Sequence, residues 1–272
     1  MFVMLTGAHG VGKTTTREAL VPLIESAYDP VLMIDEVSRT LIVEMGLTSP
    51  KQLRGDQIWE FQNRIITQQI DKEVEMLDRL HKARAAQQQP VVLSDRSIFC
   101  YMAYARLYGP RQKASGFQEY LNHERRELSR WSRAVLERVK TLGIRYRIVQ
   151  VQPLMYTKIR DDGVRGTNVR DQQMVDVLIA DLIQAPFRGS KALALPADKF
   201  IEMNSLLEQI PEQASLGEIQ FACRTMINDT LSAGKIAMLE IPNNKIAPTQ
   251  FLLRENTIKQ RARMLHALMR NP

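Results

Sequence analysis

Short apolar runs alternate with longer amphipathic segments along the first two-thirds of the chain. Each run is rich in aliphatic or β-branched residues and has the length of a buried strand; they cover residues 1–6, 31–34, 91–94 and 146–151. Between them, apolar residues recur at the three- and four-residue spacing of amphipathic helices. Strands that alternate with helices predict a parallel sheet with helices on both of its faces.

The segments between the runs predict the helices. We expect helices over residues 13–27, 36–46, 56–88, 98–108, 117–140 and 169–184. The helix at 56–88 has one apolar face, made of Ile58, Phe61, Ile65, Ile66, Ile70, Val74 and Leu77. Residues 48–55 read as a polar loop, and residues 199–203 as a fifth strand with a helix at 216–231 behind it.

A glycine-rich stretch joins the first strand to the first helix. It reads Gly7-Ala8-His9-Gly10-Val11-Gly12-Lys13-Thr14-Thr15 and has the spacing G-x-x-x-x-G-K-T of a phosphate-binding P-loop. Glycines let successive backbone N–H groups point at phosphate oxygens, Lys13 would reach the β- and γ-phosphates, and Thr14 would bind Mg²⁺. A chance match in a strand-to-helix turn is the alternative, but the strand before and the helix after both fit. We predict that this loop binds ATP or GTP with Mg²⁺.

The last forty residues depart from the strand–helix rhythm. Residues 235–241 could form a short extra strand, and residues 255–269 predict a basic helix that carries Lys259, Arg261, Arg263 and Arg270. The sequence therefore predicts two parts, a P-loop domain at 1–232 and a C-terminal extension at 233–272. The expected fold class is α/β: a three-layer P-loop NTPase fold with a parallel five-stranded sheet and a small C-terminal extension.

Composition excludes several classes of protein. The 272 residues are 44% hydrophobic and 25% charged, as in ordinary folded domains, and the formal net charge of +7 suits a phosphate-bearing partner. No apolar run approaches the ~20 residues of a membrane span. Cys100 and Cys223 match no metal or disulfide spacing. The first strand starts at once, so we expect no targeting segment and a cytoplasmic protein.

Two carboxylates follow the second apolar run, at the edge of the sheet where ligands bind in open α/β folds. Glu36 could accept the proton of an acceptor hydroxyl, and Arg39, one turn later, could hold the substrate. The alternative is a local ion pair between residues i and i+3 of a helix. Asp35 is the weaker candidate because adjacent residues at a strand end face opposite ways.

The third apolar run ends in Asp95, Arg96 and Ser97. Asp95 stands where a carboxylate that holds Mg²⁺ through water belongs; the alternative, which is compatible with that role, is a cap on the helix that begins near residue 98. Arg96 would point to the phosphates or the substrate, or form a salt bridge instead.

Residues 156–170 are rich in cations and turn residues and predict a lid. Arg160, Arg165 and Arg170 could neutralise the charge of the transition state. Arg165 is the strongest candidate because Gly163 and Gly166 flank it. The alternative is a solvated charged loop.

These motifs resemble those of P-loop kinases of small molecules. The D-R-S at 95–97 is similar to the D/E-R-S motif of deoxynucleoside and thymidylate kinases, and Glu36 matches the carboxylate that such kinases use on the acceptor hydroxyl. The W-E-F-Q at 59–62 resembles the segment that places a glutamine on the substrate base, which implies that Gln62 reads the substrate. Trp59 itself could simply belong to the core.

The overall order of motifs is most similar to the AAA-like domain family related to ribosylnicotinamide kinase. E-V-x-R stands at 36–39, F-Q at 61–62, D-R at 95–96 and D-G-V-R at 162–165. The resemblance covers residues 1 to about 185 and extends toward 231. It implies catalytic roles for Lys13, Glu36, Asp95 and Arg165, and substrate contacts for Glu36, Arg39, Gln62 and Arg96.

The sequence therefore predicts an ATP- and Mg²⁺-dependent phosphotransferase acting on a hydroxyl of a small-molecule acceptor, a nucleoside or related metabolite. A second hypothesis is a nucleotide-gated binding protein whose lid movement exposes a partner surface. A nucleic-acid acceptor is disfavoured, because the basic tail helix holds no aromatic residue on which bases could stack. The long helices could pair across a two-fold axis in a homodimer or cover the sheet.

Overall fold

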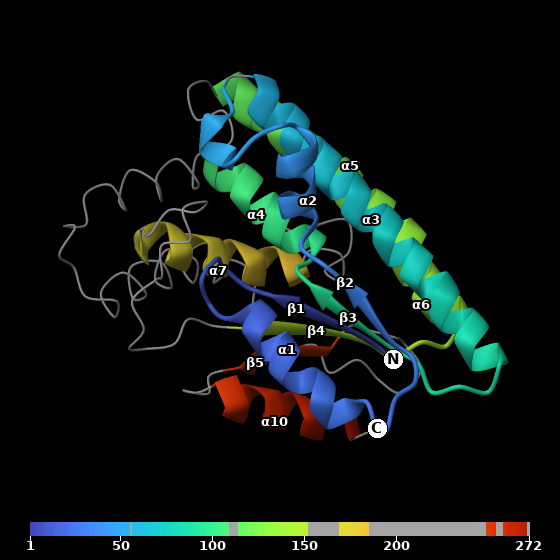
Figure 1. The fold of residues 1–272 in the computed structure, drawn as a ribbon. Coiled ribbons are helices and arrows are strands. Elements are labelled where there is room, and N and C mark those ends of the chain that lie inside the picture. Colours follow the sequence, from blue (N-terminus) through green and yellow to red (C-terminus); the bar gives the residue numbers. More distant parts are fainter. Residues whose placement is uncertain (55, 109–113, 152–168, 185–248, 254–257, 271–272) are drawn as a thin grey trace, which may run out of the picture.

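A parallel β-sheet lies at the centre of the molecule (Figure 1). The computed structural model describes the chain except for residues 55, 109–113, 152–168, 185–248, 254–257 and 271–272. The strands pair in the order β2-β3-β1-β4-β5, and every pair is parallel. Their bounds are β1 (Phe2–Thr6), β2 (Val31–Ile34), β3 (Val91–Asp95), β4 (Tyr146–Val151) and β5 (Thr249–Leu253). The predicted α/β class with a parallel sheet is confirmed.

β5, the edge strand next to β4, comes from a segment in which the sequence pattern predicts no strand. β5 pairs with β4 in a register that sets Thr249 beside Arg147 and Leu253 beside Val151. A five-residue run that opens with Thr and Gln carries little periodic signal, which explains why it was missed. The strands expected at 199–203 and 235–241, and the helix at 216–231, lie outside the described residues.

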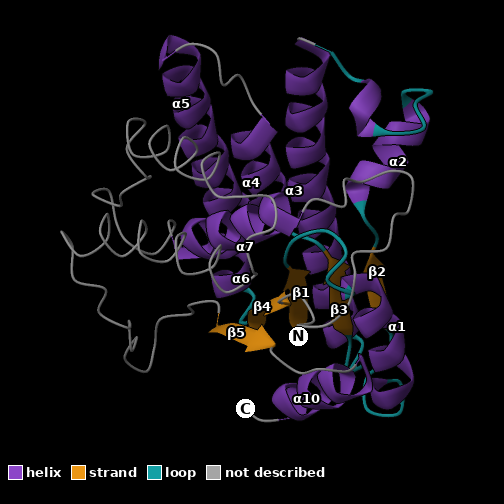
Figure 2. Ribbon diagram, turned by 90° about the vertical axis from the view of Figure 1, so that its left-hand side faces the viewer, coloured by secondary structure: helices purple, strands orange, loops and turns teal. Residues whose placement is uncertain are grey.

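Helices lie on both sides of the sheet (Figures 1 and 2). On one side α1 (Lys13–Ile24) packs along α10 (Ile258–Arg270), and on the other α4 (Ile98–Tyr108) packs between α3 (Asp56–Ala85) and α7 (Val169–Gln184). The short helix α2 (Val37–Glu44) follows β2, and a 3₁₀ turn spans Pro50–Gln52 within the segment expected to be a loop.

The helix expected over 117–140 is in fact three segments. α5 (Ala114–Trp131) runs into a π-helical stretch (Ser132–Leu136), and α6 (Glu137–Thr141) completes the rod. Trp131 and Val135 are buried at this π stretch, and the Trp131 indole donates to Glu73 of α3 at 2.8 Å. α3 therefore packs against this rod within one chain (Figure 1). A homodimer through these helices stays a prediction.

The end of the described chain returns to its beginning. α10 lies along α1 (Figure 1), and the Tyr28 hydroxyl donates to the carbonyl of Met269 at 3.2 Å. The division of the chain at residue 233 stays a prediction. No helix in the described ranges combines the length and the apolar character that a membrane crossing requires.

Candidate functional site

Glycine conformations shape the loop between β1 and α1. Gly7, Gly10 and Gly12 have φ of 143°, 69° and 83°, in the region that side chains disfavour. A Cβ on Gly7 would lie 2.4 Å from the Val151 carbonyl oxygen, so this position also lacks space for one. The loop curls tightly over the end of the sheet and delivers the chain to the N-terminus of α1.

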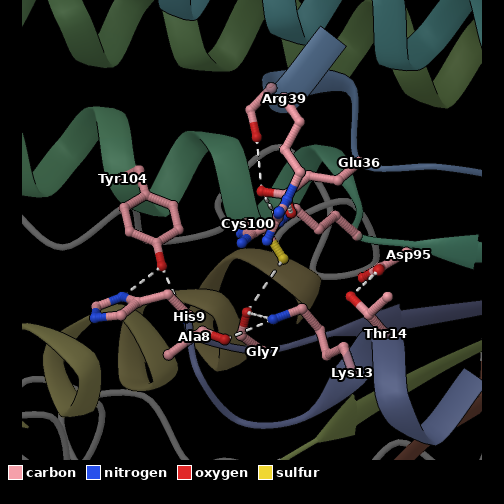
Figure 3. Close-up of polar contacts among 12 residues, drawn as sticks. Gly7, Ala8, His9, Lys13, Thr14, Glu36, Arg39, Asp95, Cys100 and Tyr104 are labelled. Carbon is pink, nitrogen blue, oxygen red and sulfur yellow. Dashed lines mark hydrogen bonds and ion pairs between the residues drawn. The ribbon is translucent and has the colours of Figure 1, made fainter. Parts of the chain in front are cut away.

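Lys13 is the first residue of α1 and reaches back across the loop (Figure 3). Its buried ammonium donates to the carbonyl oxygens of Gly7 at 2.9 Å and Ala8 at 2.5 Å. The next two residues, Thr14 and Thr15, are exposed at the start of the helix. The Lys13 cation and the exposed start of α1 thus lie at the same loop, an arrangement that suits phosphate.

Thr14 and Asp95 meet at the ends of α1 and β3 (Figure 3). The Thr14 hydroxyl donates to the Asp95 carboxylate, whose side chain is buried, and the sheet register sets Asp95 beside Leu5 of β1. Mg²⁺ prefers oxygen ligands and usually takes only one or two from the protein, keeping waters and phosphate oxygens for the rest. This pair therefore fits Mg²⁺, although within the described residues no three His, Cys, Asp or Glu side chains gather at a metal-binding distance.

The Glu36 carboxylate is held between two arginines. Its Oε1 lies 2.8 Å from Arg96 Nε and accepts from the Ser38 hydroxyl, and its Oε2 accepts from Arg39 Nε at 2.8 Å. Glu36 and Arg96 are buried, whereas the Arg39 side chain is 56% exposed. The i, i+3 ion pair considered as the alternative does form, but it is one half of a larger cluster that joins β2 to β3.

Arg96 has an unusual backbone. Its φ is 100°, which costs a residue with a side chain about 1–3 kcal/mol and concentrates at functional sites. Its N–H donates to Leu5 and its carbonyl accepts from the Ser94 hydroxyl, at 3.0 and 2.8 Å, so neighbours hold the strained conformation. Its guanidinium also lies over the Tyr104 ring, 5.7 Å from the centroid. In this conformation the Arg96 side chain lies against Glu36.

Asp35 faces away from this cluster, as expected of a neighbour on a strand end. Its side chain is 75% exposed and pairs with Arg17 at 2.8 Å. Arg17 is buried and also donates to the Ile34 carbonyl at 3.1 Å. Arg17 thereby fixes the end of β2 from the α1 side and leaves Glu36 on the other side.

Residues that the sequence analysis did not single out hold the loop from the α4 and α7 side. The Tyr104 hydroxyl lies 2.8 Å from both the backbone nitrogen and Nδ1 of His9 (Figure 3). Gln172 donates to the His9 carbonyl at 2.7 Å. His9 was assigned to the loop by spacing alone. Nothing in the sequence near Tyr104 or Gln172 marks them as its partners, because α4 and α7 meet the loop only in the fold.

A buried carboxylate lies close to the loop lysine. Asp176 of α7 accepts from the Gln150 side chain at 3.0 Å. Burial raises the pKa of Asp176 to about 6, while the Gln150 hydrogen bond and the Lys13 charge act to lower it. Neither Asp176 nor Gln150 belongs to a recognisable motif, so only the three-dimensional arrangement reveals this carboxylate.

Of the remaining residues named from the sequence, Trp59 and Gln62 lie in the described part of the chain and Arg165 does not. Trp59 is half-buried and packs its ring edge-on against Tyr120 and His123, with ring centroids 5.8 and 4.8 Å apart. Gln62, one turn along α3, has a buried side-chain oxygen without a hydrogen-bond partner in the described part of the chain. Arg165 and most of the expected lid fall within 152–168, outside the described residues.

Comparison with known families agrees with this geometry. A family model described as "AAA domain" matches residues 2–188, more than half of the chain. Among curated proteins, no match to the sequence is found. The matched span contains the P-loop, the Thr14–Asp95 pair and the Glu36 cluster. The chain therefore belongs to the AAA domain family and carries a P-loop nucleotide-binding domain.

Proposed function

We propose that the protein transfers the γ-phosphoryl group of ATP or GTP to a hydroxyl of a small molecule, a nucleoside or related metabolite, with Mg²⁺. The observation that supports this most is the Glu36 cluster: a buried carboxylate with two cations, at the strand ends that also carry the P-loop. Nucleotide binding alone needs the loop, Lys13 and Thr14. A carboxylate held across from them suits a second substrate.

The donor side of the reaction uses the loop and the ends of α1 and β3. Loop N–H groups and Lys13 would hold the phosphates, and the ammonium would leave the Gly7 and Ala8 carbonyls for phosphate oxygens. Thr14 and Asp95 would hold Mg²⁺ directly or through water. The ion supplies neutralisation of the charge that develops on the transferred group.

The acceptor side uses Glu36 chiefly to position the hydroxyl. The two guanidiniums hold the carboxylate in place, and its oxygens can accept a hydrogen bond from the acceptor hydroxyl. Phosphoryl transfer passes through a loose transition state, so orientation of the nucleophile matters more than its early deprotonation. The acceptor oxygen bonds to the γ-phosphorus, the bond to the β–γ bridging oxygen breaks, and the hydroxyl proton passes to Glu36 as the nucleoside diphosphate forms.

Arg39, Arg96 and the Gln62 amide would complete substrate recognition. Arg39 is exposed enough to turn from Glu36 toward a ligand, whereas Arg96 is fixed. Gln62 offers an amide oxygen that has no partner in the described chain, which suits a donor on the acceptor molecule. Arg165 would close from the lid onto the phosphates.

The test is consumption of ATP and of GTP with Mg²⁺, with and without a panel of nucleosides, nucleotides and pyridine ribosides. Wild type is compared with Lys13→Met, which keeps the side-chain length and removes the cation. We expect one acceptor class to raise turnover well above the acceptor-free rate and Lys13→Met to abolish the increase. Tight nucleotide binding with no acceptor effect would contradict the proposal.

That contrary result would favour a nucleotide-gated binding protein. The contacts of the loop residue His9 with Tyr104 of α4 and Gln172 of α7 support this alternative. A loop that moves on binding nucleotide would shift both helices, and α7 begins at the end of the expected lid. In that case Glu36 would be dispensable.

A further inference from the structure

One arginine of the basic C-terminal helix is completely buried. Lys259, Arg263 and Arg270 of α10 are exposed, as the sequence suggests, but Arg261 has no exposed surface. Its Nη1 donates to the carbonyl oxygen of Val11, in the P-loop, at 2.6 Å. A guanidinium stays charged when buried, so its removal from water is costly and needs compensating contacts. This cation is placed on the back of the loop.

The hydrogen bond fixes the direction of one loop peptide. The peptide group is planar and trans, so the C=O of Val11 and the N–H of Gly12 point in opposite directions. Since the Val11 carbonyl faces Arg261, the Gly12 N–H faces away from α10. Loop N–H groups are the donors that hold phosphate in a P-loop, and Gly12 directly precedes Lys13. Arg261 therefore orients a donor of the phosphate cradle.

A second residue of α10, Ile258, leaves little space for a side chain at Gly12 of the loop. A Cβ on Gly12 would lie 3.0 Å from Cδ1 of Ile258 and 3.9 Å from Nη1 of Arg261. Gly12 has φ of 83°, the left-handed conformation in which α1 begins. α10 thus fits closely over the glycine that starts the helix, and both contacts come from its first turn.

We propose that α10 is a working part of the nucleotide site and that Arg261 is a positioning residue that holds the P-loop in its phosphate-binding shape. The inference rests on the proposed nucleotide binding at this loop. It assigns a role to the tail of the chain that lies beyond the matched family span of residues 2–188.

The other end of α10 provides a matched control. The Tyr28 hydroxyl donates to the Met269 carbonyl at 3.2 Å, so Tyr28→Phe loosens the same helix without touching the loop. Arg263 is exposed on the same helix, so Arg263→Met removes an equal charge from the surface. These two variants separate orientation of the loop from attachment of the helix and from net charge.

The experiment measures the dissociation constants of ADP and ATP by titration calorimetry with the full-length chain, and the melting temperature without nucleotide. The variants are Arg261→Met, Arg261→Lys, Tyr28→Phe, Arg263→Met and Lys13→Met. We expect Arg261→Met to weaken the binding of both nucleotides about tenfold. Without Arg261 the Gly12 N–H can turn away from the phosphate, and one charge-assisted hydrogen bond is then lost. Arg261→Lys, which keeps a cation and a donor, should recover part of the loss. Both control variants should bind within about twofold of wild type.

Three results would overturn the inference. Wild-type affinity in both Arg261 variants would show that the loop needs no support from α10. An equal loss in Tyr28→Phe at an equal fall in melting temperature would show that only helix attachment matters. If Arg261→Met does not fold, Arg261→Gln, which loses the charge and most of the reach to Val11, takes its place, and wild-type affinity in that variant decides against the inference. Absence of binding in wild type, with Lys13→Met no different, would instead overturn the proposed nucleotide site itself.

Discussion

Arg96 Nε lies 2.8 Å from Glu36 Oε1, and this ion pair joins the ends of β2 and β3 inside the protein. Both side chains are buried, and Arg96 adopts a left-handed backbone conformation to make the contact. A surface ion pair contributes little and would not justify such strain. The cost falls where a second substrate would meet the nucleotide, which is why the cluster carries the proposed function.

The two arginines at Glu36 should differ in their contribution to stability. Arg96→Met leaves a buried carboxylate without one partner and should lower the free energy of unfolding by about 3 kcal/mol. Arg39→Met removes a half-exposed partner and should cost less than about 1 kcal/mol. Urea denaturation of both variants checks this, and equal losses would mean that the burial of Arg96 is unimportant.

Thr14 should control the requirement for Mg²⁺. Its hydroxyl contacts the Asp95 carboxylate, so Thr14→Val removes an oxygen from the proposed ion site, while Thr14→Ser keeps it. We expect Thr14→Val to raise the Mg²⁺ concentration for half-maximal activity about tenfold or more, with Thr14→Ser close to wild type. A Mg²⁺ titration of turnover at saturating nucleotide measures this. Identical titrations for the two variants would remove Thr14 from the site.

Much of the fold follows from local pattern. The apolar runs at 31–34 and 146–151 are strands with the expected bounds, and residues 98–108 and 169–184 are helices with the expected bounds. The P-loop could be read from spacing because its chemistry demands glycine, lysine and threonine at fixed positions. The adjacent Asp35 and Glu36 separated as strand geometry requires.

Contacts between distant segments could not be read in this way. Arg261 has the sequence context of a surface cation, and only the packing of α10 on α1 buries it against the loop. Tyr104 and Gln172 likewise reach the loop through the fold rather than through a motif. The left-handed backbone of Arg96 is unforeseeable from an arginine, since that conformation is ordinarily taken by glycine.

Gly7 should tolerate no side chain. Gly7→Ala combines a φ of 143° with a Cβ only 2.4 Å from a backbone oxygen of β4, so the loop or the strand must move. We expect a loss of stability of about 3 kcal/mol or failure to fold. Gly46→Ala is the control: its φ is 68° but nothing lies within 4 Å, so only about 1 kcal/mol of strain applies. Thermal melts compare the two, and similar losses would contradict the crowding at Gly7.

Glu73 should make stability depend on pH. It is fully buried among Gln69, Trp131 and Tyr146, and burial raises its pKa from 4.5 to about 7 against the lowering effect of those hydrogen bonds. Between pH 4.5 and about 7, Glu73 is therefore protonated in the folded protein and ionised in the unfolded chain. The stability from protonated Glu73 is fully present below pH 4.5 and is lost as pH rises through 7.

The variant Glu73→Gln should lack this dependence. The stability of wild type relative to Glu73→Gln should fall by on the order of 3 kcal/mol between pH 4.5 and 8, measured by urea denaturation. Asp176 acts in the same direction and remains in both proteins. Glu75→Gln, an exposed carboxylate on the same helix, controls for loss of a charge. A constant difference across this range would mean that Glu73 is not protonated in the fold.

The most direct test of the central claim is the acceptor-dependent turnover of Glu36→Gln beside Asp35→Asn, with nucleotide affinity measured in both. The two substitutions neutralise adjacent carboxylates, one buried between arginines and one exposed against Arg17. We predict that Glu36→Gln lowers turnover about a hundredfold or more with nucleotide affinity unchanged, and that Asp35→Asn stays within a few-fold of wild type. Full turnover in Glu36→Gln, or an equal loss in both, would contradict a role for Glu36 at the acceptor.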